Sequence, residues 1–187
     1  TNSFNLVWEK ICAEIMDNQL DVPLGILKLP VPLKEDYNRR QKLIELIEKP
    51  LWTITGKCAK DTLIPDLVSI CKVNEQHQFI IFDAKYYNAH LEKGIVPTGQ
   101  PGIESITKQY LYQLAYQRFI EDHKFSSVKN CFLLPTENNE IEDKGEVRME
   151  MLSNLGLQDI KIRLIPATMA YDLYLSGSKM DMERLDL

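Results

Sequence analysis

The sequence lacks several features that would point to common functional classes. Its apolar runs fall well short of the roughly 20 residues that a membrane-spanning helix needs, so we expect no membrane partner. The 8 glycines form no GxGxxG, GxxxxGKS or GxxxxGKT loop, which leaves no nucleotide-binding signature in the chain. Histidine is also scarce: His77, His90 and His123 are isolated, and none has a triad-like spacing with serine or cysteine.

Cysteine is sparse and scattered. Cys12, Cys58, Cys71 and Cys131 form no CxxC pair and have no neighbouring histidine, which excludes a zinc signature. Their apolar surroundings predict buried free thiols that act as packing groups. Free thiols persist in a reducing compartment, so we expect a cytoplasmic protein.

Charge is unevenly distributed along the 187 residues. Residues 1–136 hold as many basic as acidic side chains, so residues 137–187 supply the whole net charge of −5. This distribution argues against a binder that is basic on all faces, but it permits a local basic face. The length predicts a single domain, residues 1–187, and the start at Thr1 indicates a piece of a longer protein.

Helical and strand-like patterns alternate along the chain. Residues 3–18 begin with Ser3 as a plausible N-cap and carry apolar residues, including Phe4 and Trp8, at helical spacing. Polar residues 73–77 predict a hairpin between two apolar runs, and residues 136–146 predict a solvated loop. The expected helices are residues 3–18, 34–49, 103–120 and 167–175, and the expected strands are residues 51–55, 62–72, 78–87, 127–135 and 160–166. Such an order predicts an α/β or α+β domain on a mixed sheet flanked by helices.

Acidic residues inside two of the apolar runs indicate chemistry. Asp83 and Lys85 flank an alanine in "FIIFDAKYY", so both side chains lie on the same face of a strand. If this strand pairs with "TLIPDLVSIC" as a hairpin, Asp66 faces Asp83 across the ladder. Two adjacent carboxylates favour a cation between them, and oxygen ligands suit Mg²⁺. A structural salt bridge at a sheet edge is the alternative interpretation.

The same residues resemble a known nuclease signature. "IPD" followed by "FDAK" is similar to the PD-(D/E)XK motif, and "FNLVWEKIC" and "KQYLYQLAY" extend the resemblance to LlaJI-type restriction endonucleases. The resemblance implies a restriction-endonuclease-like core and Mg²⁺-dependent cleavage of double-stranded DNA in the bacterial cytoplasm, with Mn²⁺ able to replace Mg²⁺. It also implies a DNA-recognition domain upstream of residues 1–187, a McrB-like GTPase partner, and a possible homodimer on DNA.

The resemblance assigns roles to particular residues. Asp66 and Asp83 become metal ligands and Lys85 the catalytic lysine. Glu9 matches the acid of the first helix that completes the metal site, although Glu14 lies nearer the apolar border of the expected helix and remains the alternative. Gln109 matches the helix after the lysine, where it could contact phosphate or orient water.

Two other functions compete with this interpretation. Another PD-(D/E)XK nuclease, Mrr-like or junction-cleaving, would carry the same motif. A catalytically inactive DNA-binding scaffold of the same fold would have no need of intact Asp66, Asp83 and Lys85.

Overall fold

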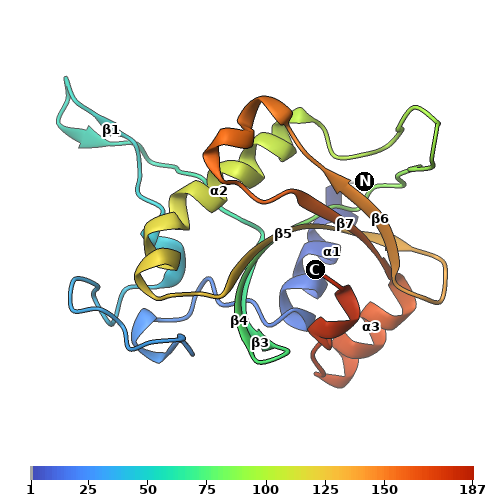
Figure 1. The fold of residues 1–187 in the computed structure, drawn as a ribbon, viewed down its shortest axis with the longest axis horizontal. Coiled ribbons are helices and arrows are strands. Elements are labelled where there is room, and N and C mark those ends of the chain that lie inside the picture. The colour runs from blue at the N-terminus through green and yellow to red at the C-terminus, as the bar shows by residue number, and fades with distance from the viewer. Residues whose placement is uncertain (1) are drawn as a thin grey trace.

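The computed structural model describes residues 2–187, with side chains from Ser3 onward, and is built on a mixed five-stranded sheet (Figure 1). The sheet order is β3-β4-β5-β7-β6, with β4, β5 and β7 parallel and both edge strands antiparallel. Its strands are β3 (Leu67–Val73), β4 (Gln76–Ala84), β5 (Ser127–Thr136), β6 (Glu142–Val147) and β7 (Ile160–Pro166). The expected α+β domain on a mixed sheet is thus confirmed.

Three α-helices cover the two faces of the sheet (Figure 1). Helices α1 (Asn2–Ile15) and α3 (Ala167–Ser176) pack on the face formed by Leu67, Phe82 and Leu133. Helix α2 (Ile103–Asp122) packs on the opposite face. Because helices cover both faces of the sheet, the side chains on either side of β4 are buried, which explains its nearly continuous hydrophobic sequence.

The predicted hairpin between β3 and β4 is confirmed. Val73 pairs with Gln76, and the two turn residues, Asn74 and Glu75, have φ values of 48° and 63°. Positive φ at both central residues is the geometry of a type I′ turn, which matches the twist of the flanking strands. The register then runs back to the pair Leu67–Phe82, so that Asp66 and Asp83 follow directly at the open end of the hairpin.

The prediction of a helix over residues 34–49 is wrong. Only a single 3-10 turn, η2 (Leu43–Leu46), forms there. The backbone instead pairs with the preceding segment: Leu24 N–H donates to Gln41 O (2.8 Å) and Ile44 N–H donates to Leu20 O (2.9 Å). These long-range bonds take the groups that a helix would use internally. Three further 3-10 turns are η1 (Leu24–Ile26), η3 (Glu150–Leu155) and η4 (Met182–Leu185).

Two strand predictions are also corrected. Residues 51–55 do not enter the main sheet; β1 (Leu51–Trp52) pairs only with β2 (Lys57–Cys58) in a separate ribbon that projects from the molecule (Figure 1). The solvated loop expected over residues 136–146 contains most of the edge strand β6. The consecutive charged residues at the start of β6, EDK, hid this strand, because an edge strand needs few apolar side chains.

Details of the first helix and of the cysteines differ from the expectations. Ser3 lies inside α1 rather than at its N-cap, and Phe4 is exposed. Cys58 is an exposed thiol on the ribbon, not a buried one. Among residues 2–187, no helix is both long and apolar enough to cross a membrane.

Candidate active site

Three charged side chains converge where β3 begins and β4 ends. Lys85 Nζ lies 2.6 Å from Asp83 Oδ1 and 3.6 Å from Asp66 Oδ2. The side chain of Asp83 is only 8% exposed, while those of Asp66 and Lys85 are partly buried. The structure therefore brings together the three residues that the sequence predicts as one cluster.

Backbone hydrogen bonds hold each member of this cluster in place. The Ala84 N–H donates to Asp66 Oδ2 (2.9 Å), which ties the Asp66 side chain to the end of β4. The Lys85 N–H donates to Leu133 O (2.9 Å) and so extends the parallel pairing of β4 with β5 by one residue. Strand alternation then directs Asp83 and Lys85 to the same side. Both neighbours of β4 thus contribute to the geometry of the cluster.

The cluster has an excess of negative charge when all three groups are ionised. Burial and the Asp66 carboxylate raise the pKa of Asp83 to about 8, against the lowering effect of Lys85. Burial lowers the pKa of Lys85, but Asp83 and Asp66 outweigh burial and raise it above its usual range. Lys85 is therefore an ammonium at neutral pH, and the second carboxylate is unfavourable unless a proton or another cation neutralises it.

Glu9 lies close to the cluster, whereas Glu14 does not. Burial and the Asp66 carboxylate raise the pKa of Glu9, and Lys85 offsets part of this shift. No ion pair or hydrogen bond joins the Glu9 side chain to the cluster within residues 3–187. Glu14 is exposed and faces Lys179 instead, with Oε2 3.7 Å from the ammonium. Of the two acids that the sequence left open, Glu9 is the one on the side of the cluster.

Trp8 connects α1 to the same place. Its indole Nε1–H donates to Leu133 O (3.1 Å), the carbonyl oxygen that also accepts from the Lys85 N–H. Tyr86, the next residue, stacks on Phe4 with ring centroids 5.9 Å apart. Phe4 therefore packs beside the site rather than in the core, which explains its exposure despite its helical spacing with Trp8.

Gln109 is not part of the cluster. It is fully buried, and its Nε2 donates to Ile81 O (2.7 Å) and to Asn130 Oδ1 (3.3 Å). Gln113 continues this network by accepting from Asn130 Nδ2 at 2.7 Å. Their spacing puts both glutamines on the stripe of α2 that faces the sheet. The structure thus places Gln109 at the contact between α2 and the sheet, where its Nε2 bonds to protein atoms, and its role towards phosphate or water stays a prediction.

Tyr112 is a residue near the cluster whose role the sequence analysis missed. Its hydroxyl donates to Ile64 O (2.9 Å), two residues before Asp66. Burial, followed by the Asp83 and Asp66 carboxylates, raises the pKa of Tyr112 to about 12. The four-residue spacing from Tyr112 to Tyr116 gave a signal for an inward-facing stripe, but the bond to an irregular backbone segment had no signature in the sequence.

The donor chemistry of the cluster fits a hard divalent cation. Asp66 and Asp83 offer only oxygen atoms, and burial and the Asp66 carboxylate raise the pKa of Asp83, with one ammonium, Lys85, facing the two carboxyl groups. Within the described chain, no three His, Cys, Asp or Glu side chains form a complete metal site. Mg²⁺ commonly binds through one or two carboxylates and completes its shell with water and phosphate oxygens.

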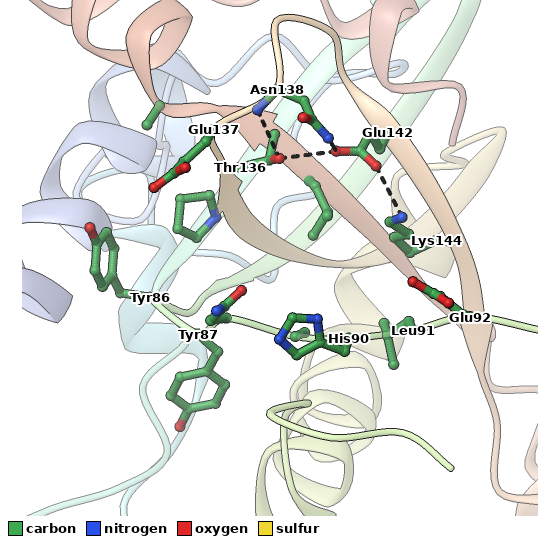
Figure 2. Close-up of a pocket in the computed structure, with 15 residues that line it drawn as sticks. Tyr86, Tyr87, His90, Leu91, Glu92, Thr136, Glu137, Asn138, Glu142 and Lys144 are labelled. Atoms are coloured by element: carbon green, nitrogen blue, oxygen red, sulfur yellow. Dashed lines mark hydrogen bonds and ion pairs between the residues drawn. The ribbon is translucent and has the colours of Figure 1, made fainter. Parts of the chain in front are cut away.

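An open cleft of about 560 Å³ begins directly after Lys85 (Figure 2). The segment after Lys85, including His90, forms one wall of the cleft. The end of β5 and the start of β6 form the opposite wall. Glu142 accepts hydrogen bonds from Thr136 and Asn138 and pairs with Lys144 at 3.0 Å. The carboxylates of Glu92 and Glu137 also line the cleft, which makes it an unfavourable path for a phosphate backbone.

Together, these features define the class of protein. A mixed sheet flanked by helices, with an Asp-Ala-Lys sequence at the end of a central strand and an aspartate beside it, is compatible with a restriction-endonuclease-like core.

Comparisons with known proteins then give the family. The profile described as "LlaJI restriction endonuclease" matches residues 1–170, and the chain belongs to this family. A relative in Bacillus subtilis (strain 168), "Type II restriction enzyme BsuMI component YdjA", is 27% identical over 191 residues. The alignment covers 99% of this chain but only 35% of the relative, so the chain spans about a third of that protein's length. No solved structure matches the chain significantly.

Proposed function

We propose that this chain is a PD-(D/E)XK nuclease domain that hydrolyses phosphodiester bonds of double-stranded DNA in the presence of Mg²⁺. One observation carries the proposal: in a member of a restriction endonuclease family, the buried Asp83 carboxylate lies 2.6 Å from Lys85 and beside a second carboxylate. A pair of carboxylates with one ammonium at a strand end has the charges that metal-assisted phosphodiester hydrolysis needs.

The residues of the chain divide the chemistry between them. Asp66 and Asp83 would hold Mg²⁺, which supplies Lewis acidity at the scissile phosphate and acidifies bound water. Lys85, an ammonium at neutral pH, stabilises the negative charge that develops on the phosphate and orients the attacking water. Trp8 and the Leu133 carbonyl keep the backbone of Lys85 fixed, so that its ammonium approaches the substrate from a constant direction. Mn²⁺ would replace Mg²⁺ because it accepts the same oxygen ligands.

The remainder of the enzyme is part of the proposal. The chain matches only 35% of its bacterial relative, and we propose that DNA-sequence recognition resides in a domain upstream of residue 1. The relative is described as a component, which is consistent with further subunits. A McrB-like GTPase partner and a homodimer on DNA are the assemblies we propose.

Cleavage of supercoiled plasmid DNA tests the proposal. The purified chain should nick or linearise the plasmid with Mg²⁺ or Mn²⁺, and excess EDTA should stop the reaction. Asp83→Asn and Lys85→Ala should each reduce the rate by at least about a hundredfold, within the range of losses for a single group that stabilises the transition state. Glu14→Gln, which removes an exposed acid outside the cluster, is the matched control and should cleave normally. Undiminished cleavage in EDTA, or by Asp83→Asn, would contradict the proposal.

A further inference from the structure

The β1–β2 ribbon, residues 49–60, is a strongly exposed part of the fold. Every residue from 48 to 58 is solvent-exposed, including Trp52 (64%) and Ile54 (96%). The two strands pair only with each other, and the ribbon projects from one end of the molecule (Figure 1). Exposed aromatic and aliphatic side chains that gather on one element can mark an interaction site.

The ribbon is locally basic. Lys49, Lys57 and Lys60 lie within it, and residues 49–60 contain no acidic residue, although the net charge of the chain is −5. None of these three lysines forms an ion pair with any residue in 3–187, although two exposed acids, Glu48 and Asp61, flank the ribbon at its base. The ribbon therefore presents three ammonium groups without ion-pair partners on a chain that is acidic as a whole, and these groups are complementary to a polyanion.

The pairing register defines the two faces of the ribbon. Trp52 lies directly opposite Lys57, and Leu51 lies opposite Cys58. Because directly opposed residues of an antiparallel pair point to the same side, one face carries an indole beside an ammonium. An ammonium can contact a phosphate while the neighbouring ring contacts sugar or base edges. Leu51 and Cys58 lie on the opposite face.

We propose that the β1–β2 ribbon is a DNA-contacting arm that lies in a groove of the duplex and engages its phosphates through Lys49, Lys57 and Lys60. A two-stranded ribbon is one of the two elements that fit the major groove. The contacts are sequence-independent, because ammonium–phosphate contacts position a protein on DNA without reading bases. This inference rests on the proposed function for its choice of partner, and it adds the surface by which the nuclease domain holds its substrate.

Salt-dependent binding is the first test. Fluorescence anisotropy with a labelled duplex in EDTA measures affinity without cleavage. The triple variant Lys49→Gln, Lys57→Gln, Lys60→Gln should lower the slope of log affinity against log salt by about 2.7, since each neutralised phosphate adds about 0.9. From about 50 to about 200 mM salt, the wild type should then lose roughly 40-fold more affinity than the triple variant.

The matched control, Lys10→Gln, Lys28→Gln, Lys124→Gln, makes the same charge change on exposed lysines outside the ribbon and should keep the wild-type slope. Equal slopes for the two triple variants would overturn the proposal.

Tryptophan fluorescence is the second test. The chain has only 2 tryptophans, and Trp8 is buried, so acrylamide quenching reports almost entirely on Trp52. Duplex DNA should protect Trp52 from acrylamide, and Trp52→Phe should abolish this change. Protection that follows protein concentration without DNA would instead identify a second copy of the chain as the occupant and would overturn the proposal.

The outcomes separate this inference from the proposed function. If the wild type cleaves DNA but the ribbon variant binds like its control, the ribbon assignment fails while the nuclease assignment stands. If binding depends on the ribbon but the wild type shows no metal-dependent cleavage, the ribbon assignment stands while the nuclease assignment fails. A wild type that neither binds nor cleaves DNA would contradict both.

Discussion

The indole N–H of Trp8 donates to the carbonyl oxygen of Leu133, 125 residues further along the chain. The Lys85 N–H donates to the same oxygen, so one backbone group connects the first helix, the central strand β5 and the lysine of the cluster. The position of the site thus depends on a contact between α1 and the sheet that no local sequence pattern contains.

Trp8→Phe should destabilise the protein. It removes a buried hydrogen bond and part of a buried ring, for which we expect a loss of about 1 to 3 kcal/mol in the free energy of unfolding. Urea unfolding monitored by circular dichroism measures the change. Trp52→Phe makes the same substitution at an exposed position and should shift the free energy by less than about 0.5 kcal/mol. Equal effects at the two positions would contradict the packing described for Trp8.

Asp83 should make stability fall with rising pH in the absence of divalent metal. Its pKa is about 8 in the folded protein and about 3.9 in an unfolded chain, so the folded state retains a proton that the unfolded state has lost. The stabilisation from this proton is complete below about pH 4 and is lost as the pH rises to about 8. Urea unfolding in EDTA from about pH 5.5 to 8.5 measures the slope, which for one proton does not exceed about 1.4 kcal/mol per pH unit.

Asp83→Asn is the control for this pH dependence. The amide does not titrate, so the part of the pH-dependent fall in the free energy of unfolding that Asp83 causes in the wild type should be absent from the variant. Parallel stability curves for wild type and Asp83→Asn across this range would show that Asp83 has no raised pKa.

Tyr112→Phe should weaken the support of Asp66. The Tyr112 hydroxyl donates to Ile64 O, and removal of this bond should cost about 1 kcal/mol of stability. Because Asp66 follows two residues later, Mn²⁺ affinity should fall by up to about tenfold, as when a group that supports a metal ligand is lost. Calorimetry and urea unfolding measure the two effects. Tyr171→Phe, at a partly exposed position, is the control; metal affinity equal to that of the control would show that Tyr112 does not position Asp66.

The chain alone should bind DNA weakly and without sequence preference. Its net charge is −5, Gln109 and Gln113 are buried against the sheet, and few lysines can contact phosphate at once. Dissociation constants of about 10⁻⁶ to 10⁻⁴ M at physiological salt are typical of such non-specific binding. Anisotropy on several unrelated duplexes measures affinity and preference. Nanomolar binding to one duplex would place sequence recognition inside residues 1–187.

Regular elements of the core could be predicted from the sequence because their patterns are local. The β3–β4 hairpin and β7 are apolar runs of strand length, α2 is a long helical segment, and the hairpin alone brings Asp66 towards Asp83. Residues 34–49 show equally good helical spacing, yet their backbone pairs with residues 20–25. Such long-range pairing overrides local propensity, and a single sequence does not reveal it.

In the site, too, some residues could be predicted from the sequence and others could not. Asp66, Asp83 and Lys85 could be predicted together, because strand alternation and a hairpin register are enough to align them. Gln109 could not be placed, since a polar residue on the inward stripe of a helix is indistinguishable in sequence from one that faces a substrate. Its partners, Ile81 and Asn130, become neighbours only when α2 packs on the sheet.

Calorimetric titration with Mn²⁺ tests the central claim, that Asp66 and Asp83 bind a divalent metal beside Lys85. The wild type should bind one Mn²⁺, and Asp83→Asn should lower the affinity by at least about tenfold, or about 1.4 kcal/mol, because it removes a charged oxygen ligand at nearly constant size. Lys85→Ala should bind Mn²⁺ at least as tightly as the wild type, since the neighbouring positive charge is gone. Glu14→Gln should match the wild type. Equal affinity for Mn²⁺ in the wild type and in Asp83→Asn would contradict the account.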